Sequence, residues 1–214
     1  MQTLIQFDNT FYTDKIKIIA GIDEAGRGPV AGPVVVAGVI FKKDDFIEGV
    51  MDSKKLKEKK LEELYYKIRK KALNYSISII SHKTIDEINI LQATFKGMRE
   101  VANKLKSKPD LILIDGRDEP LNRNKFNQQS IIKGDAKSFS IAAASIIAKV
   151  TRDKIMRFYD KHFPEYYFAS HKGYGTKKHR AIIDKIGRCE IHRQSFRFKD
   201  EDSKQLELFW EVVF

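Results

Sequence analysis

Four acidic residues of this chain lie where apolar segments end or begin, a placement that could serve chemistry. Asp23 and Glu24 end one apolar segment and lead into a glycine-rich turn, and Asp115 ends another. Asp135 lies in a Lys-Gly-Asp turn before a long segment of apolar and small residues. An Asp-Glu pair alone is typical of a solvated strand end. The two further acids favour a ligand site, because ligands of α/β proteins usually bind at strand ends.

Carboxylates that converged at one sheet edge would repel one another and would therefore need cations. The ligand atoms are oxygens, which favours Mg²⁺ or Mn²⁺, and a pair of such ions is suited to cleaving a phosphodiester bond. Cys189 is the only cysteine, which excludes an intramolecular disulfide and a cysteine-based zinc cage. A reducing, cytoplasmic location is expected.

The glycine-rich turn also fits a competing motif. Residues 26–31 (GRGPVA) satisfy the letters of the dinucleotide-binding fingerprint G-x-G-x-x-G/A. That fingerprint must open a helix whose N-terminus holds the pyrophosphate, whereas a β-branched segment follows here. The sequence also lacks the P-loop, HExxH and GxSxG motifs. P-loop hydrolases, zincins and serine hydrolases are therefore disfavoured.

The elements that must position the acids alternate between strands and helices. β-branched runs predict strands, and apolar residues at helical spacing with lysines opposite predict amphipathic helices. Ser53 fits the N-cap of the first helix, and Thr84 with Glu87 forms a capping box for the second. The sum is an α/β fold around one sheet. Strands are predicted over 15–23, 32–41, 75–81 and 111–114 and near residue 131, and helices from residue 53, from 84 to about 105, and over 140–159.

Composition narrows the class of protein further. The chain has 40 Lys and Arg against 29 Asp and Glu, a formal net charge of +11, which favours polyanionic partners such as nucleic acid but also suits a well-solvated surface. Its 214 residues favour one domain, and 42% hydrophobic content suffices for a core. The longest apolar stretch, about 30–41, is too short to span a bilayer, and no signal peptide opens the chain. Neither secretion nor membrane insertion is expected.

Ordered motifs over nearly the whole chain resemble the bacterial ribonuclease HII family. They are GIDEAGRGPVAGPVVVAGVI, DSKKL, IDEINILQAT, LILIDG, KGD, SIIAKVTRD, HKGYGT and HRQSF, from about residue 18 to residue 196. So many matches in one order make the resemblance specific. It implies a ribonuclease H-like fold, with a central mixed sheet flanked by helices and a small helical C-terminal subdomain.

The resemblance implies an activity as well. The family cleaves RNA in RNA/DNA hybrids and 5′ to single ribonucleotides in duplex DNA, leaving 3′-hydroxyl and 5′-phosphate ends, with roles in ribonucleotide excision repair and RNA primer removal. The family's metal-binding acids fall on Asp23, Glu24, Asp115 and Asp135, which would hold two Mg²⁺ or Mn²⁺ ions during catalysis. These are the four acids that the residue pattern selects.

Further residues are implied to contact the substrate. Backbone groups of a Gly-Arg-Gly turn can approach a sugar closely because glycine has no Cβ, and a 2′-hydroxyl must be contacted to tell RNA from DNA. The resemblance gives this role to Gly26, Arg27 and Gly28. It also implies that Tyr174 packs on the adjacent deoxyribose. The alternative for Tyr174 is a residue of the core, which the flanking glycines disfavour. Phosphate contacts are expected from Lys54, Lys55 and Lys172, with a solvated face as the alternative for any single lysine.

Several other polar residues have more than one reading. Asp153 is expected to pair with Arg152 or another nearby base rather than with a metal ion. His171, His179 and His192 lie in a basic region, where phosphate contact and packing or solvation are about equally favoured.

The chain is expected to divide into a catalytic core over 1–160, a helical C-terminal subdomain over 161–198 that carries the substrate-contacting loop, and a tail over 199–214. The tail contains QLELF, which resembles the peptide by which bacterial replication proteins dock on the sliding clamp. That would assign partner binding to Gln205, Leu206, Leu208 and Phe209; the alternative is an amphipathic segment that packs on the body. A monomer is the default expectation at this size.

Two alternatives to the ribonuclease remain open from the residues. One is a nucleic-acid-binding module of the same fold without catalysis, which four intact acids disfavour. The other is a different nuclease of the superfamily, such as a transposase or junction resolvase, which the Gly-Arg-Gly turn and Tyr174 disfavour. Cleavage assays on duplexes with and without a ribonucleotide distinguish all three.

Overall fold

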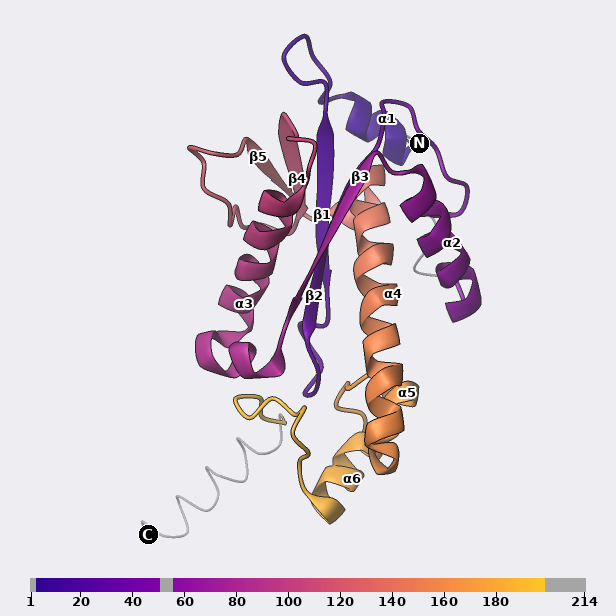
Figure 1. The fold of residues 1–214 in the computed structure, drawn as a ribbon, viewed down its shortest axis with the longest axis vertical. Helices are drawn as coiled ribbons and strands as arrows, with labels where there is room; N and C mark the ends of the chain where they lie inside the picture. Colours follow the sequence, from indigo (N-terminus) through magenta and orange to yellow (C-terminus); the bar gives the residue numbers. More distant parts are fainter. Residues whose placement is uncertain (1–2, 51–55, 199–214) are drawn as a thin grey trace.

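The centre of the molecule is a five-stranded mixed sheet in the order β3-β2-β1-β4-β5 (Figure 1). The computed structural model describes residues 3–50 and 56–198. Strand β1 pairs antiparallel with β2 and parallel with β4, while β2–β3 is antiparallel and β4–β5 is parallel. The expected fold class is therefore confirmed. The strands are β1 Ile19–Ala25, β2 Val34–Ile40, β3 Asn74–Ile80, β4 Leu111–Asp115 and β5 Gln128–Ile131.

Helices cover both faces of the two central strands, which is why β1 and β2 lack a clean polar alternation. Every residue of β2 is buried. Helix α3 (His82–Lys104) packs on one face, and α4 (Phe139–His162) packs on the other. Gly21 permits the closest approach, because a Cβ there would lie 2.1 Å from the backbone carbon of Ser140. The central strand and α4 thus touch backbone to backbone just before Asp23.

Shorter helices complete the molecule. They are α1 Leu4–Asn9, α2 Glu58–Lys71, α5 Phe168–His171 and α6 Lys177–Ile186. Helix α1 was not predicted, and its Asp8 accepts hydrogen bonds from the backbone N–H and the hydroxyl of Ser140 at the start of α4. A carboxylate at that position stabilises the helix N-terminus.

Two predicted helix starts are wrong. Helix α2 begins after Lys57 rather than at Ser53, which lies outside the described residues. Helix α3 is capped by Ser81, whose hydroxyl accepts from the Thr84 N–H, so Thr84 lies inside the first turn and forms no capping box. Strand β3 ends at Ile80, so the next residue, Ser81, becomes the N-cap, earlier than the sequence pattern indicated.

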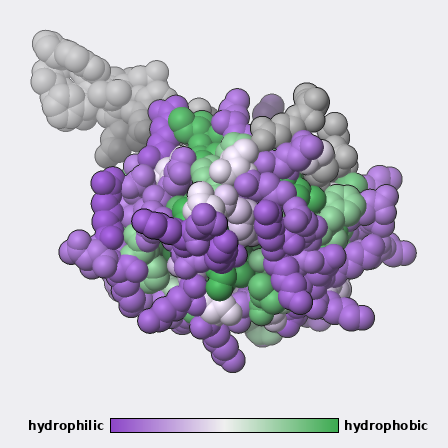
Figure 2. All heavy atoms as spheres, turned by 90° about the horizontal axis from the view of Figure 1, so that it is seen from above, coloured by the Kyte–Doolittle hydropathy of each residue, from purple (hydrophilic) through white to green (hydrophobic). Residues whose placement is uncertain are grey.

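The C-terminal part gathers around the far end of α4, where α5 and α6 lie (Figure 1). Helix α4 runs unbroken to His162, so a boundary at residue 160 would fall in its last turn. Seen from the opposite end of the molecule, the surface is mostly hydrophilic with small separate apolar areas (Figure 2). In the part of the chain that is described, no helix is long and apolar enough to cross a membrane.

Candidate active site

Three of the four acids come together at the ends of two parallel strands. Asp23 and Glu24 lie near the end of β1, and Asp115 is the last residue of β4. The register pairs Ile22 with Ile114, which places the next residues of the two strands, Asp23 and Asp115, side by side. The parallel β1–β4 pairing therefore brings together carboxylates that are far apart in the sequence.

The electrostatics of this cluster are unfavourable for negative charge. Burial, with the charges of Glu24 and Asp115, raises the pKa of the Asp23 carboxyl well above its usual range. Burial also raises the pKa of Glu24, although the Arg27 guanidinium opposes that shift, its Nη1 lying 3.4 Å from Glu24 Oε1. Asp23 accepts a hydrogen bond from the Glu24 N–H at 2.7 Å, and the neighbouring Ser145 hydroxyl acts against the rise in its pKa; both groups are neutral. A cation at Asp23 would be strongly stabilised.

The fourth acid, Asp135, follows a turn that is hydrogen-bonded to Asp115. The N–H of Gly134 donates to Asp115 Oδ1 at 2.6 Å, which ties the Lys-Gly-Asp turn to the end of β4. Asp135 follows directly, in a short 3₁₀ helix over Gly134–Ala136. Lys133 before it adopts a left-handed conformation with φ of 56°. The tight turn thus places Asp135 next to a residue that contacts Asp115.

The donor set suits a hard divalent cation, because all four side chains offer carboxylate oxygens. Within residues 3–50 and 56–198, no three histidine, cysteine, aspartate or glutamate side chains come close enough to hold one ion together. The arrangement fits Mg²⁺-type binding, in which one or two carboxylates act with water and substrate phosphate. It does not form a closed cage of protein ligands.

The Gly-Arg-Gly turn leaves β1 directly beside this cluster. Gly26 has φ of 100°, and a Cβ there would lie 2.1 Å from Arg152 Nε, so both backbone strain and space require glycine. At Gly28 a Cβ would meet only Tyr174 Cε1, at 3.7 Å. The turn is thus packed tightly on its inner side at Gly26 and bordered by a tyrosine ring at Gly28.

The structure brings the predicted ribose-reading turn and Tyr174 together. The N–H of Val30 donates to the carbonyl of Gly173 at 2.9 Å, joining the two loops. Tyr174 is 50% exposed, so it is not a core residue. Two loops about 145 residues apart in the sequence therefore form one surface beside the acids.

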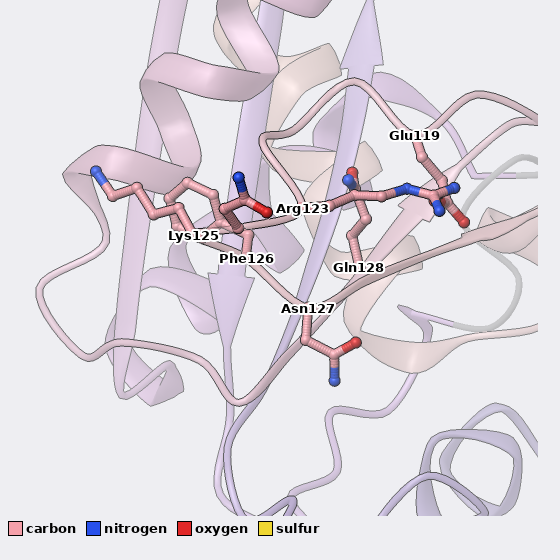
Figure 3. A pocket seen from close by; sticks show the side chains of 7 residues that line it. Glu119, Arg123, Lys125, Phe126, Asn127 and Gln128 are labelled. Carbon is pink, nitrogen blue, oxygen red and sulfur yellow. The ribbon is translucent and has the colours of Figure 1, made fainter.

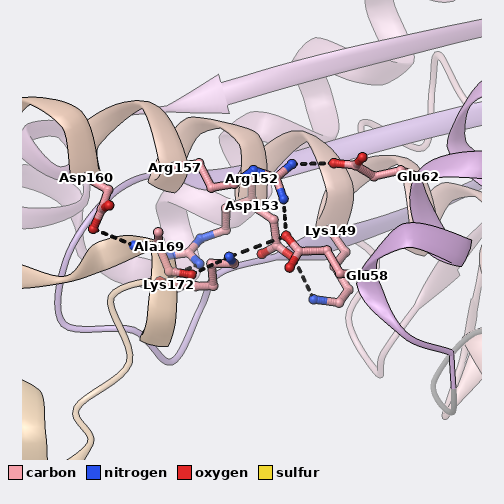
Figure 4. Close-up of polar contacts among 9 residues, drawn as sticks. All are labelled: Glu58, Glu62, Lys149, Arg152, Asp153, Arg157, Asp160, Ala169 and Lys172. Atoms are coloured by element: carbon pink, nitrogen blue, oxygen red, sulfur yellow. Dashed lines mark hydrogen bonds and ion pairs between the residues drawn. The ribbon is translucent and has the colours of Figure 1, made fainter.

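Lys172 is less available than the sequence analysis expected. Its side chain is 15% exposed, and its ammonium donates to the Ala169 carbonyl at 2.6 Å and lies 3.4 Å from Glu58 of α2 (Figure 4). In the same cluster Asp153 pairs with Lys149 at 2.8 Å, which confirms a structural role with a nearby base. Lys54, Lys55 and the tail residues Gln205, Leu206, Leu208 and Phe209 lie outside the described residues.

His171, His179 and His192 are buried and form directed hydrogen bonds beneath the Tyr174 loop. The Cys189 N–H donates to His192 Nδ1, so His192 Nε2 carries the proton and faces His179 Nε2 at 3.0 Å. His179 Nδ1 then donates to the Tyr174 carbonyl at 2.9 Å. His171 stacks on His179 with ring centroids 4.1 Å apart. Packing, rather than phosphate contact, accounts for these histidines.

Two arginines were missed by the sequence analysis as parts of the site. Arg152 is 2% exposed and Arg193 is fully buried, and both guanidinium groups lie under the Gly-Arg-Gly turn. The available signal was an arginine amid the small and apolar residues of α4, and a second in the HRQSF motif.

A hollow of about 450 Å³ lies elsewhere, at the β4–β5 connection (Figure 3). It includes none of the four acids among its lining residues, which are Glu119 and Arg123 to Gln128.

The mixed sheet, the helices on both faces and the carboxylates at the ends of β1 and β4 define a ribonuclease H-like α/β protein. The family model for ribonuclease HII matches residues 20–199. Ribonuclease HII of Clostridioides difficile (strain 630) is 54% identical over 92% of this chain and 76% of its own. The chain belongs to the ribonuclease HII family and is an endonuclease of the ribonuclease H type.

Solved structures agree with this assignment. The crystal structure of ribonuclease H2 from Pyrococcus horikoshii OT3 matches with a TM-score of 0.73 and 28% identity, covering 89% of this chain and 99% of that one. Ribonuclease HII of Archaeoglobus fulgidus, solved as a complex with PCNA, matches with a TM-score of 0.73 and 30% identity, covering 85% of this chain and 96% of that one. The sequence resemblance is therefore confirmed.

Proposed function

We propose that this chain cuts RNA in RNA/DNA hybrids and the phosphodiester bond 5′ to single ribonucleotides in duplex DNA, leaving 3′-hydroxyl and 5′-phosphate ends. The observation that supports this most is Asp23, a buried carboxylate beside Glu24 and Asp115 at the end of the central strand. Loop 26–28 follows these acids along the chain, and the exposed ring of Tyr174 borders this loop at Gly28. The acidic cluster and the surface formed by the two loops therefore adjoin each other.

We propose Asp23, Glu24, Asp115 and Asp135 as the ligands of Mg²⁺ or Mn²⁺. Such ions supply Lewis-acid stabilisation of the attacking and leaving oxygens of an in-line displacement. The Arg27 guanidinium pairs with the Glu24 carboxylate, with Nη1 3.4 Å from Oε1. Ser145 orients Asp23 through its hydroxyl.

The neighbouring loops account for substrate choice in this proposal. Backbone groups of Gly26, Arg27 and Gly28 contact the ribose, whose 2′-hydroxyl is what distinguishes it from deoxyribose. Tyr174, whose ring borders Gly28, contacts the next sugar. Lys54, Lys55 and Lys172 are proposed phosphate contacts; for Lys172 this requires release from Glu58.

The test is a cleavage assay with three duplexes of one sequence: all DNA, DNA with a single ribonucleotide, and an RNA/DNA hybrid. Cleavage of the latter two with Mg²⁺ or Mn²⁺, and loss of cleavage with a chelator, is expected. Cleavage of the all-DNA duplex would overturn ribonucleotide specificity. Binding without cleavage in any metal would overturn the catalytic assignment of the four acids.

We also propose that the tail docks on a bacterial sliding clamp through Gln205, Leu206, Leu208 and Phe209. The support is the QLELF sequence, together with the archaeal ribonuclease HII solved with the sliding clamp PCNA. In a pull-down with purified clamp, Phe209→Ala should abolish capture. Glu207→Ala, at the variable position of the motif, is the matched control and should retain it; equal capture by both variants would refute the docking peptide.

A further inference from the structure

Two positive charges are buried beneath the Gly-Arg-Gly turn. Arg152 and Arg193 are almost completely shielded from solvent, and burial lowers their pKa to about 10 and about 9, respectively. Among the described residues, no carboxylate lies within ion-pair distance of either guanidinium. A buried charge without a counter-ion is costly, so these two must be compensated by other groups.

Backbone carbonyls provide that compensation at Arg193. Its Nη2 donates to the Gly26 carbonyl at 2.6 Å, its Nη1 to the Arg27 carbonyl at 2.9 Å and its Nε to the Gly32 carbonyl at 2.9 Å. Nη2 lies 3.2 Å from the Pro33 carbonyl as well. The Arg193 side chain therefore holds two peptide groups of the turn. One joins Gly26 to Arg27, and the other joins Arg27 to Gly28.

Arg152 holds the surrounding backbone rather than the turn itself. Its three nitrogens donate to the carbonyls of Pro33 at 3.0 Å, Lys172 at 2.9 Å and Ala31 at 3.1 Å. It thereby joins the segment after the turn to the loop that carries Tyr174. Of the two arginines, Arg193 is the one that donates hydrogen bonds to carbonyls of the turn, whereas Arg152 packs against Gly26.

The geometry of the peptide bond gives the Arg193 contacts a further consequence. In a trans peptide the carbonyl of one residue and the N–H of the next point in opposite directions. Because Arg193 draws the Gly26 and Arg27 carbonyls inward, the N–H groups of Arg27 and Gly28 point away from the buried guanidinium. Within the described part of the chain, neither N–H donates to a protein acceptor.

We propose that Arg193 is a positioning residue for ribonucleotide recognition, because it orients the N–H groups of Arg27 and Gly28 as donors to the 2′-hydroxyl oxygen without touching the substrate. The inference rests on the proposed function of the Gly-Arg-Gly turn. An arginine is required because its planar group presents several donors in a fixed fork, whereas a lysine ammonium is a single point of charge.

The backbone of Arg193 has anchors independent of its side chain. Its N–H donates to the Val30 carbonyl at 2.9 Å, and Ile191 accepts from the Gly32 N–H at 2.9 Å. Asp86 of α3 accepts from the N–H groups of Gln194 and Ser195. A side chain with fewer hydrogen-bond donors at position 193 should therefore leave the backbone of this segment in place. Arg193→Lys is thus a usable test.

The experiment measures binding rather than turnover. In an Asp23→Asn background, affinities are compared for two duplexes of one sequence, all DNA and DNA with one ribonucleotide. Arg193→Lys should lower the ratio of these affinities at least about tenfold, the effect of losing one or more well-placed hydrogen bonds, while affinity for all-DNA duplex stays the same. Arg188→Lys is the control, because Arg188 also donates to two carbonyls of this segment, those of Arg193 and Phe196, but to none of the turn.

Each outcome has one meaning. An unchanged ratio for Arg193→Lys, with discrimination present in the background protein, overturns the positioning role. An equal loss for both duplexes also overturns it, since it indicates a merely structural defect. If the background protein itself shows no discrimination between the duplexes, the proposed recognition by the turn fails instead. Thermal unfolding of each variant confirms that the proteins compared are folded.

Discussion

The acidic cluster and the buried arginine pair are opposite in charge and lie next to each other. Around Asp23, burial and the like charges of neighbouring acids raise the pKa of the carboxyl group, so a positive ligand is favoured there. Around Arg152 and Arg193, like charges are stabilised by backbone carbonyls of the protein itself. The acids therefore need a ligand to stabilise their charge, whereas the charges of the arginines are already stabilised by the protein. This difference separates a site built for chemistry from one built to hold loops.

The largest effect should follow from neutralising the acidic cluster. Asp23→Asn keeps the shape but removes a buried charge, so turnover should fall by at least about 10³-fold because a proposed metal ligand is lost. Because the repulsion with Glu24 and Asp115 disappears, the free energy of unfolding without metal should stay the same or rise by about 1 kcal/mol. Single-turnover cleavage and urea unfolding measure the two quantities.

Asp14→Asn is the control for that prediction, since the Asp14 carboxylate is fully exposed and pairs at the surface with Lys17. It removes the same charge and should change neither quantity. If Asp23→Asn instead lost as much stability as a core substitution, the Asp23 charge would be stabilising the fold. The contrast between the acidic cluster and the arginine pair would then fail.

The arginine pair should behave in the opposite way. Arg152→Met leaves buried carbonyls without donors, so the free energy of unfolding should fall by about 3–5 kcal/mol. Arg157→Met, on the same helix but paired at the surface with Glu58 and Glu62, should cost less than about 1 kcal/mol. Urea denaturation at neutral pH compares them; equal losses would show that the carbonyl contacts of Arg152 carry no special weight.

The buried histidines extend the comparison to pH. Burial lowers the pKa of His179 and of His192 to about 4, with nearby Arg188 and His171 acting in the same direction. The unfolded chain therefore binds more protons than the folded one between about pH 6.5 and pH 4, so their contribution is present above pH 6.5 and is lost as pH falls. From pH 6.5 down to pH 5 the loss should be on the order of 2 kcal/mol per histidine.

Urea unfolding at pH 7 and pH 5 checks this contribution. His192→Gln should be less stable than the parent at pH 7 and should lose less stability on acidification. His162→Gln, which replaces an exposed histidine at the end of α4, should follow the parent at both values. Parallel behaviour of His192→Gln and the parent would contradict the assignment of the acid loss to the buried pair.

The smallest effects should distinguish the two glycines of the turn. Gly26→Ala forces a side chain into a left-handed conformation against Arg152, so it should cost about 2 kcal/mol of stability. Gly28→Ala meets only the Tyr174 ring at an ordinary contact distance and should change stability by less than about 0.5 kcal/mol. Thermal unfolding of the pair shows whether the turn is held mainly from its inner side.

Much of the fold followed from local pattern. The strands and long helices were predicted within a few residues, because β-branched runs and amphipathic spacing are strong local signals. The start of α3 was not predicted correctly, because its N-cap, Ser81, is set by where strand β3 ends. Helix α1 was missed because it is short, and its place is set by Asp8 reaching the distant start of α4.

The sequence by itself determined the residue types: four acids at segment ends, the Gly-Arg-Gly turn and the ordered motifs that indicate the family. The tertiary structure decided which of them meet. Parallel pairing of β1 with β4 sets Asp23 beside Asp115, and packing of the C-terminal part sets Arg193 under Gly26. The physical reason is that burial and long-range hydrogen bonds depend on partners about 90 to 170 residues away, and no local pattern encodes them.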